Sequence, residues 1–422
     1  MKEADMADRT ILVVGTYDTK DAELNYIREV IKAQGGRVLS MDVSVLGDPS
    51  APTDISKHQV AQEGGSSIAQ AIASGDENHA MQIMAQGGAA LVSRLYAQGR
   101  FDAMIVLGGT MGTDLALDLC AALPLGVPKY VVSTVAFSPL LPPERIAADV
   151  QMILWAGGLY GLNSICKASL SQAAGAVLGA ARAVELPDRR KPLIGMTSFG
   201  KSFLKYMVTL KPELEKRGFE VAVFHATGMG GRAFESLAAQ GAFACVFDFA
   251  TQEVGNHLGG SAISAGADRL TNAGRTGTPQ IIAPGCHDLV DIVGWHPRPE
   301  KWKDHPSHAH NRLLASIVLD HAERRAVAAA HGEKLGQATG PTALILPLRG
   351  VHDLDRAGND LHDPEGLLAF YDALKSACPD ALELHEVDAH INDLAFAEKA
   401  LEIFDTWRAE GLIGAVESGA LT

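Results

Sequence analysis

The stretch ILVVGTYDTKDAEL, residues 11–24, leads an apolar strand directly into a Gly/Thr/Lys turn and then into a helix. The first backbone N–H groups of a helix have no partner within it, so a turn of this kind creates an anion-binding geometry. Gly15 permits close approach of a ligand, and Thr16, Thr19 and Lys20 add hydroxyls and a cation. The spacing matches neither a P-loop nor a dinucleotide fingerprint. A tight turn with a capped helix is therefore an equal alternative.

A second loop of the same kind shifts the balance towards a ligand. The apolar run FDAMIVL, residues 101–107, is followed by GGTMGTD, residues 108–114, and an Ala/Leu-rich stretch. In doubly wound sheets, ligands bind beyond the carboxyl ends of the strands, where the winding direction reverses. We therefore expect both loops to face one crevice that holds a phosphate-bearing ligand.

Composition excludes several classes of protein. The chain has 422 residues, 47% of them hydrophobic, with 43 glycines, which fits an α/β protein of two or three domains. A net charge of −14 argues against a broad nucleic-acid surface. No charge-free apolar stretch is long enough for a membrane span, and residues 1–10 lack an apolar leader core, so we expect a cytoplasmic protein. The five scattered cysteines suit reduced thiols.

Apolar runs alternate with helical stretches in a βαβ rhythm, which is typical of parallel sheets covered by helices. In the first half we expect strands at 11–14, 37–43, 103–107 and 130–133, and helices at 21–34, 56–73, 78–98, 113–122 and 168–184. The charged, proline-bracketed segment ELPDRRKP, residues 185–192, indicates a boundary. We therefore expect a nucleotide-binding domain at 1–188 and a second domain, the candidate substrate domain, at 189–422.

The rhythm restarts after this boundary. We expect strands at 193–197, 219–224, 244–248, 280–283, 343–347 and 382–387, and helices at 202–217, 231–240, 309–331, 365–377 and 393–410. The predicted fold class is α/β, with two Rossmann-like three-layer domains, mainly parallel sheets and a cleft between them.

Nearly every strand of the second half ends in polar or glycine-rich residues, which would converge at one edge of a parallel sheet. We expect this edge to hold a small anionic substrate through Ser198, Gly200, Lys201, Thr227, Gly228, Gly230 and Gly231. Glu253, His287 or His352 would then transfer protons, and Cys286 is a candidate nucleophile. For Glu253 the alternative is a helix cap or an ion pair with Arg269 or Arg275. For Cys286, adjacency to His287 in sequence does not establish contact in space.

The segment from Trp295 to Arg312 is rich in histidine. Neutral imidazole can bind a divalent transition metal or perform acid/base chemistry. The alternative is a solvated loop with incidental histidines, because neither H-x-x-x-H nor H-E-x-x-H occurs there and His308 and His310 are only two residues apart. The metal content of the chain is therefore left open.

Six motifs, in order, resemble the Tm-1-like ATP-binding family, also called UPF0261. They are GTYDTK (15–20), GGT (108–110), ATGMGG (226–231), AGADRL (265–270), APG (283–285) and HIND (390–393). The resemblance covers nearly the whole chain. It implies two Rossmann-like domains, ATP and Mg²⁺ bound by the first domain, and a homodimer.

Transferred to matching positions, the resemblance implies a set of ATP contacts, namely Gly15, Thr16, Asp18, Thr19, Lys20, Gly108, Gly109, Thr110, Gly112 and Thr113. Asp42, at the end of the second strand, could accept from ribose hydroxyls, or could cap a turn or helix. Asp18 and Asp114 could orient Mg²⁺ through water, or could cap helices.

The sequence thus predicts an ATP-binding protein of this family that is also a cytoplasmic metabolic enzyme, with an unidentified small anionic substrate in its second domain. One alternative is a non-catalytic nucleotide-binding module that regulates a partner. Another is a metal-assisted hydrolase or lyase that uses the His/Glu groups of the second domain.

Overall fold

The computed structural model describes residues 8–187, 191–200 and 203–414. Lys201, which was predicted to bind the substrate, lies outside the described residues. The chain divides into two compact units, Met1–Pro187 (unit 1) and Asp188–Thr422 (unit 2).

Unit 1 contains a parallel sheet with strand order β2-β1-β3-β4-β5. The strands are β1 (Thr10–Gly15), β2 (Arg37–Asp42), β3 (Ala103–Gly108), β4 (Lys129–Ser133) and β5 (Val150–Leu154). The helices are α1 (Asp21–Ala33), α2 (Lys57–Glu63), α3 (Ile68–Ala73), α4 (Glu77–Ala97), α5 (Thr110–Ala121), η2 (Pro143–Arg145) and α6 (Ser164–Ala183).

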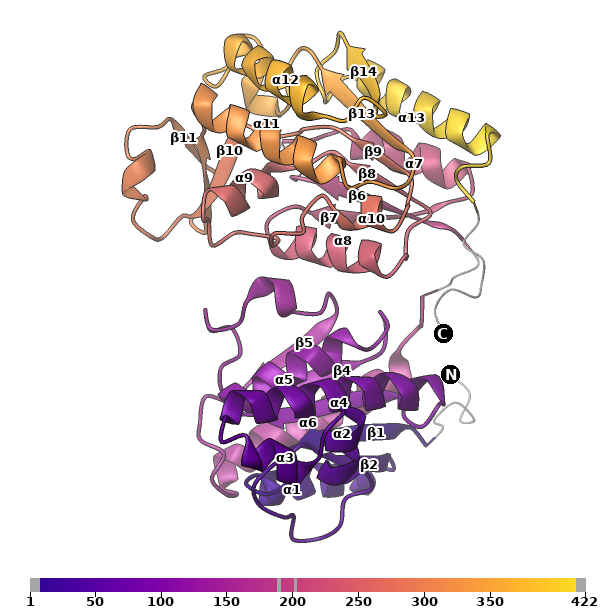
Figure 1. Cartoon of the computed structure of the whole chain (residues 1–422), viewed down its shortest axis with the longest axis vertical. Coiled ribbons are helices and arrows are strands. Elements are labelled where there is room, and N and C mark those ends of the chain that lie inside the picture. The colour runs from indigo at the N-terminus through magenta and orange to yellow at the C-terminus, as the bar shows by residue number, and fades with distance from the viewer. Residues whose placement is uncertain (1–7, 188–190, 201–202, 415–422) are drawn as a thin grey trace. The chain divides into compact units, whose positions relative to one another are not determined.

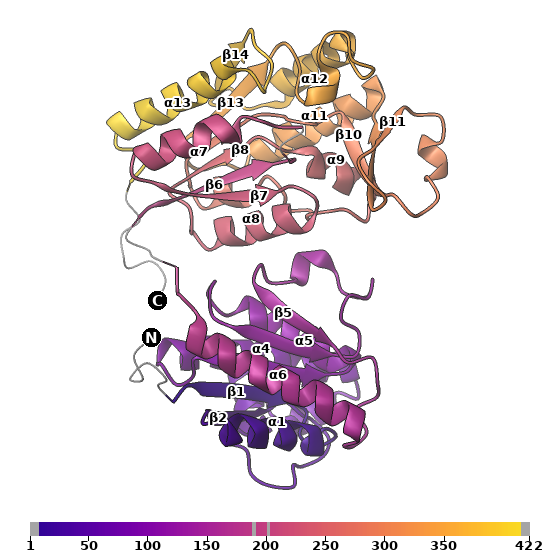
Figure 2. The ribbon, with the colours of Figure 1, turned by 180° about the vertical axis from the view of Figure 1, so that it is seen from behind.

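Helices cover both faces of this sheet, because its central strand is apolar on both sides. Ile11 and Val13 of β1 pack with α1 and α6, whereas Leu12 and Val14 pack with α2 to α5. The two helical layers are visible from opposite sides in Figures 1 and 2. Unit 1 is therefore a three-layer α/β domain.

Unit 2 has the same strand order with one strand more, β14-β13-β9-β8-β6-β7, and all these pairs are parallel. The strands are β6 (Leu193–Ser198), β7 (Glu220–His225), β8 (Cys245–Asp248), β9 (Gln280–Ile282), β13 (Thr342–Pro347) and β14 (Glu383–Val387). The helices are α7 (Met207–Lys216), α8 (Met229–Ala239), α9 (Gln252–Leu258), α10 (Asn272–Arg275), η3 (Glu300–Trp302), α11 (His321–Leu335), η4 (Asp353–Asp355), α12 (Pro364–Ala377) and α13 (Leu394–Ala409). One core contains α7 and α13, and another contains α9, α11 and α12.

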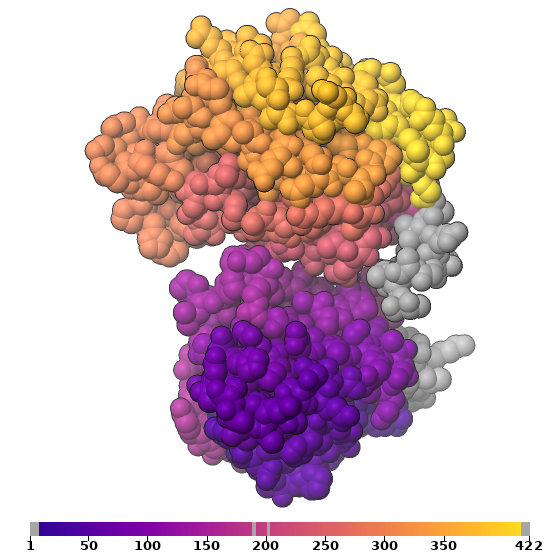
Figure 3. Space-filling view, in the orientation of Figure 1, coloured from indigo at the N-terminus to yellow at the C-terminus, as the bar shows by residue number. Residues whose placement is uncertain are grey.

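An antiparallel sheet follows β9 and was not expected from the sequence. Its order is β10-β12-β11, with β10 at Leu289–Val293, β11 at Ser307–Ala309 and β12 at Leu314–Val318. In Figure 3 the orange segment around β11 projects from the edge of unit 2. The predicted helix at 309–331 is wrong in its first half, because the run LASIV forms β12. The helix starts only at His321, after Asp320, which forms a capping box with Glu323.

Smaller differences have similar local causes. The predicted helix 56–73 is two helices, α2 and α3, because glycines 64 and 65 end the first and Ser67 caps the second. Strand β5 was missed. Helix α5 starts at Thr110, three residues earlier than predicted, so Gly109 is its N-cap residue. The α/β class with mainly parallel sheets in two domains is confirmed.

None of the helices in the described parts of the chain is long and apolar enough to cross a membrane.

Candidate functional site

The winding direction of unit 1 reverses between β1 and β3. The loops that follow these two strands, residues 16–20 and 109–112, both line a cavity of about 650 Å³. This is the position at which doubly wound sheets bind ligands. The structure thus brings together the two loops that the sequence singled out.

The helices that start at this cavity have no capping side chain. Neither Lys20 at the start of α1 nor Gly109 at the start of α5 caps its helix through a side chain. The other α-helices described in unit 1 are capped by Ser56, Ser67, Asp76 and Asn163. The first N–H groups of α1 and α5 therefore lack the partner that the other helices have, and an anion can supply it.

The rest of the cavity wall is largely apolar and is suited to a flat, weakly polar group. Its apolar lining residues are Val43, Val45, Leu46, Ala71, Ile72, Ala80, Met81 and Met111. Lys20 also lines the cavity, with Nζ 5.6 Å from the centre of the Tyr160 ring. The cavity therefore combines an anion-binding end with an apolar end.

Not every predicted nucleotide contact lines this cavity. Asp42 is 1% exposed, and its Oδ1 accepts from the backbone N–H of Tyr17 (3.2 Å) and of Ser44 (2.9 Å). Asp42 therefore braces the turn after β1, and the ribose role predicted for it has no support in the lining. Thr113 is fully buried and donates to the Gly109 carbonyl at 2.7 Å, so it fastens the first turn of α5.

Gly15 and Gly108 serve the packing between strand and helix. A Cβ atom at Gly108 would lie 2.5 Å from the backbone of Gly112, and one at Gly15 would lie 2.8 Å from Leu24. Gly109 is different, because a Cβ atom there would meet only Thr134 Oγ1 at 3.8 Å. Gly109 thus leaves open space in front of α5.

Asp18 and Asp114, the two predicted metal-orienting residues, differ in position. Asp18 lines the cavity; its Oδ2 accepts from the Gly47 N–H at 3.2 Å, and its buried Oδ1 has no partner among the described residues. Asp114 forms an ion pair with Arg145 and does not line the cavity. A cation next to a bound phosphate would therefore meet Asp18.

In unit 2 the winding reverses between β6 and β8, and this position is filled by buried charges. Arg269 is fully buried and binds both carboxylate oxygens of Asp248, at 2.5 and 2.7 Å. Asp248 also accepts from Thr197 at the end of β6. Glu253 and Glu235 accept from Arg269 as well, at 2.7 and 3.3 Å. One guanidinium thus faces three carboxylates.

For Glu253, this arrangement shows the ion pair that the sequence gave as the alternative to proton transfer. The side chain is fully buried, lines none of the cavities described here, and accepts from Arg269 and from the Gly228 N–H at 2.6 Å. Burial raises the pKa of Glu253 to about 7, although Arg269 opposes this shift. The ion pair with Arg269, one of the two readings of the sequence, is the one observed.

The predicted substrate loop at residues 227–231 is also a packing element. Gly228 has a φ of 83°, which favours glycine. A Cβ atom at Gly230 would lie 1.8 Å from the His225 carbonyl, and one at Gly231 would lie 1.9 Å from Glu253. Thr227 contacts His225 at 3.1 Å, and Ser198 is buried against Met207. Of the described residues in the predicted set, Gly200 is the one that lines a cavity.

His287 lines a cavity of about 410 Å³ beyond β9 and β13. Its Nδ1 lies 3.0 Å from the Pro284 carbonyl, which can only accept, so the ring proton is on Nδ1. Its buried Nε2 has no partner among the described residues. Burial lowers the pKa of His287 to about 3, so the ring is neutral. Asp288 Oδ1 is a second buried acceptor without a partner in the described structure. The same cavity is lined by Arg324, which is 2% exposed.

His352 and Cys286 are less suited to the roles predicted for them. His352 Nδ1 accepts from the Leu354 N–H at 3.2 Å, and Nε2 lies 3.1 Å from Asp288 Oδ2, so both ring nitrogens are engaged. Burial raises the pKa of the Cys286 thiol well above its usual value. Cys286 has a φ of 57°, an unusual conformation for a residue with a side chain, directly before His287. Neither residue lines the cavity, and neither offers a free base or thiolate.

A third cavity, of about 510 Å³, contains histidines from separate elements. Its lining residues are Phe199, Gly200, Phe203, His225, His308, His310, Asn311, Leu314, Asp353, Leu354 and Asn359. His310 Nε2 lies 2.8 Å from Ser316 Oγ, which donates to the buried Asp291 at 2.6 Å. Burial lowers the pKa of His310 to about 4, and burial raises that of Asp291 to about 6. Sequence reasoning found the histidines but missed Ser316 and Asp291, because only strand pairing brings them close.

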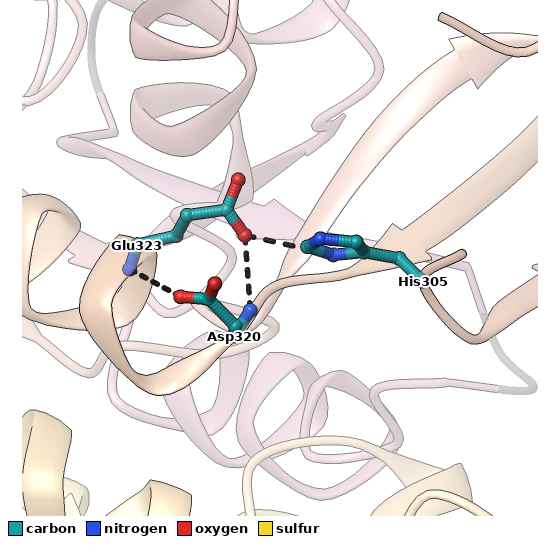
Figure 4. Close-up of side chains that lie close together, drawn as sticks. All are labelled: His305, Asp320 and Glu323. Carbon is teal, nitrogen blue, oxygen red and sulfur yellow. Dashed lines mark hydrogen bonds and ion pairs between the residues drawn. The ribbon is translucent and has the colours of Figure 1, made fainter. Parts of the chain in front are cut away.

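Figure 4 shows a separate group, His305, Asp320 and Glu323, whose ligand atoms lie within 4.8 Å of one another. Its members already have partners. Asp320 caps α11, Glu323 accepts from Asp320 N at 3.0 Å and from Trp302 Nε1 at 2.8 Å, and His305 Nδ1 contacts the Val318 carbonyl at 2.9 Å. The group is therefore accounted for by the capping box at the start of α11, beside which His305 packs.

Comparison with known proteins gives matches across both units. The family described as "Uncharacterised protein family (UPF0261) N-terminal domain" matches residues 9–186, and its C-terminal domain matches residues 191–408. A UPF0261 protein of Brucella suis biovar 1 (strain 1330) is 57% identical over 403 residues, which cover 96% of each chain. A UPF0261 protein of Clostridium tetani (strain Massachusetts / E88) is 36% identical, over 92% of this chain and 96% of that one. The "ToMV susceptible protein tm-1(GCR26)" of Solanum lycopersicum is 29% identical, over 77% of this chain and 44% of that protein.

Proposed function

The chain belongs to the UPF0261 family, and from this premise and the cavity of unit 1 we propose that the protein binds ATP with Mg²⁺ between the loops that follow β1 and β3. The observation that carries the proposal is the pair of helices, α1 and α5, that start at an apolar-walled cavity without capping side chains. Phosphates supply the missing acceptors, and the apolar wall accommodates the base.

The residues divide into three roles in this proposal. The N–H groups at the start of α5 and the ammonium group of Lys20 hold phosphate oxygens. Asp18, whose Oδ1 has no partner in the described parts of the chain, holds Mg²⁺ through water. The apolar group that includes Val45, Ile72 and Met111 encloses the adenine.

Calorimetric titration of ATP, with and without Mg²⁺, tests this proposal in the wild type and in Lys20→Ala. A charge-assisted phosphate contact is worth about 1.5–3 kcal/mol, so the variant should bind roughly ten- to a hundredfold more weakly. Lys32→Ala is the matched control, because Lys32 lies in the last turn of the same helix and pairs with Glu29. Equal affinity in all three proteins would remove Lys20 from the site, and absence of any nucleotide binding would refute the proposal.

A second proposal concerns unit 2, where the protein acts as an enzyme on a small anionic substrate. The cavity beside His287 supports it, because the buried Arg324 offers a cation while His287 Nε2 and Asp288 Oδ1 are acceptors in need of a donor. A small acid with one hydroxyl satisfies Arg324 and one of the two acceptors, and an acid with two hydroxyls, such as glycerol phosphate, can satisfy all three groups. Proton transfer then falls to His287.

Thermal unfolding in the presence of glycolate, lactate, malate and glycerol phosphate tests this second proposal. One of these acids should raise the melting temperature of the wild type and have a smaller effect on His287→Gln. His385→Gln is the control, since His385 lies on β14 and does not line the cavity. A shift of equal size in all three proteins would exclude His287 from the binding site.

The alternative is a regulatory module in which ATP changes partner affinity without turnover. Incubation with ATP and the binding acid, followed by product analysis, separates these readings. Expression in the cytoplasm and assembly into a homodimer belong to the same proposal, and light scattering of the purified chain tests the dimer.

A further inference from the structure

We propose that His308 and His310 bind a divalent transition metal ion in the 510 Å³ cavity of unit 2. This site lies in a different cavity from the proposed ATP site and does not depend on it. The cavity beside His287 likewise shares none of its lining residues.

The antiparallel sheet determines which residues face this cavity. In the sheet order β10-β12-β11, Asp291 pairs with Ser316 and Ser316 pairs with His308. Directly opposed residues of antiparallel strands point to the same face, and so do residues two apart along one strand. The pairing therefore places His308 on the same face as Ser316. His310 lies one residue beyond β11, and its Nε2, 2.8 Å from Ser316 Oγ, places its imidazole on that face too.

The two imidazoles have a separation suited to one metal ion. Their ring centres are 4.9 Å apart with the planes at 81°. Two imidazoles that bind one zinc ion tetrahedrally, at about 2.0–2.1 Å from nitrogen to metal, place their ring centres roughly 5 Å apart. Neither ring therefore has to move far to share an ion.

The hydrogen bonds of His310 determine which nitrogen is free. The single hydroxyl proton of Ser316 goes to Asp291, so Ser316 Oγ accepts from His310 Nε2–H and the lone pair of His310 is on Nδ1. Metal-binding histidines are usually oriented in this manner, with the second nitrogen held by a carboxylate or a group that leads to one. Asp291 is in turn held by Asn256 at 3.2 Å.

The remaining coordination positions are open to the cavity. His225 lines the same cavity, and its Nδ1 contacts Thr227 at 3.1 Å, which leaves Nε2 available. Among the residues that the structure describes, the one group of three whose ligand atoms already converge is that of Figure 4, so a third ligand here requires rotation of His225 or a water molecule. Imidazole ligands with open positions favour zinc, cobalt, nickel or copper over magnesium and calcium.

Titration of the chelator-treated full-length chain with Zn²⁺ and Co²⁺ tests the proposal, with calorimetry for affinity and visible absorption of Co²⁺ for geometry. We expect one equivalent to bind the wild type, and His308→Ala and His310→Ala each to lower its affinity at least tenfold. Ser316→Ala should lower the affinity about tenfold or more through loss of the orienting bond, and Ser316→Thr should restore it.

His305→Ala is the decisive control, because it removes the histidine of the group in Figure 4 and leaves the cavity unchanged. Unchanged metal affinity in this variant supports the proposal. Loss of binding in His305→Ala with retention in His308→Ala would overturn it, and so would absence of binding in the wild type. Circular dichroism verifies folding, and His308→Ala keeps the test valid if loss of the His310 bond disturbs the sheet.

Discussion

The two units place different groups at the same point of the same topology. Both sheets reverse their winding next to the first strand, between β1 and β3 in unit 1 and between β6 and β8 in unit 2. In unit 1 this point opens into a cavity flanked by uncapped helices. In unit 2 it is closed by Arg269 and three carboxylates, all of them buried.

We call the position where the winding reverses the switch point. The difference shows that a switch point can bind a ligand only if the residues of its loops leave it open. Unit 1 keeps it because small residues such as Gly109 precede the helix. Unit 2 fills it because Asp248 ends β8 with a carboxylate, which requires a buried partner. Its cavities therefore lie elsewhere, beyond β9 and β13 and beside the antiparallel sheet.

The largest expected effect comes from Arg269→Met. Removal of the guanidinium leaves three buried carboxylates without their cation, and breaking a buried pair in this way costs about 3–5 kcal/mol. Urea unfolding of unit 2 should shift accordingly, while ATP binding by unit 1 stays unchanged. Arg217→Met is the control, because Arg217 also pairs with two carboxylates but is partly exposed, so it should cost about 1 kcal/mol or less. Equal losses of unfolding free energy in both variants would mean that the buried cluster stabilises unit 2 no more than a partly exposed ion pair does.

A second prediction concerns a substitution that blocks the open switch point of unit 1. Gly109→Asp places a carboxylate at the N-cap of α5, where it accepts from the first turn and repels phosphate. The added Cβ atom has space, since only Thr134 lies within 4 Å of it. ATP affinity should fall at least a hundredfold, roughly 2.7 kcal/mol, while thermal stability is kept or slightly raised. Calorimetry and a melting curve measure the two effects.

Asn163→Asp is the matched control for this variant. It also adds one negative charge at an N-cap, that of α6, whose first residue does not line the cavity. This control should bind ATP like the wild type. Retained affinity in Gly109→Asp would show that the start of α5 is not the phosphate site.

The sequence predicted the open site better than the closed one. An apolar strand followed by glycine and threonine indicates the first loop from neighbouring residues alone, and the two loops were correctly expected to share a crevice. For Asp42, the choice between a ribose contact and a turn cap depended on the direction of its carboxylate, which the sequence does not show. For Glu253, the choice between a free base and an ion pair depended on Arg269, which lies 16 residues further along the chain and is brought into contact by a loop.

The antiparallel sheet was beyond prediction for a different reason. The run LASIV before α11 is short and apolar, and periodicity cannot separate a strand from a buried helical segment of that length. Without the strand pairing, the contacts that join His310 to Ser316 and Asp291 have no signal in sequence. The histidines could be singled out, but their supporting groups could not.

The smallest predicted effect concerns the proton held by the closed switch point. Burial raises the pKa of Glu253 to about 7 from the usual 4.5, so between these values the folded chain retains a proton that the unfolded chain has released. The free energy of unfolding should therefore fall as pH rises through this window, by at most about 1.4 kcal/mol per pH unit.

Glu253→Gln cannot titrate at this position, so the difference in unfolding free energy between the wild type and this variant should shrink by about 2 kcal/mol between pH 5 and pH 7. Urea unfolding at pH 5, 6 and 7 measures this, with the exposed Glu398→Gln as control; a constant difference would place the retained proton on another group.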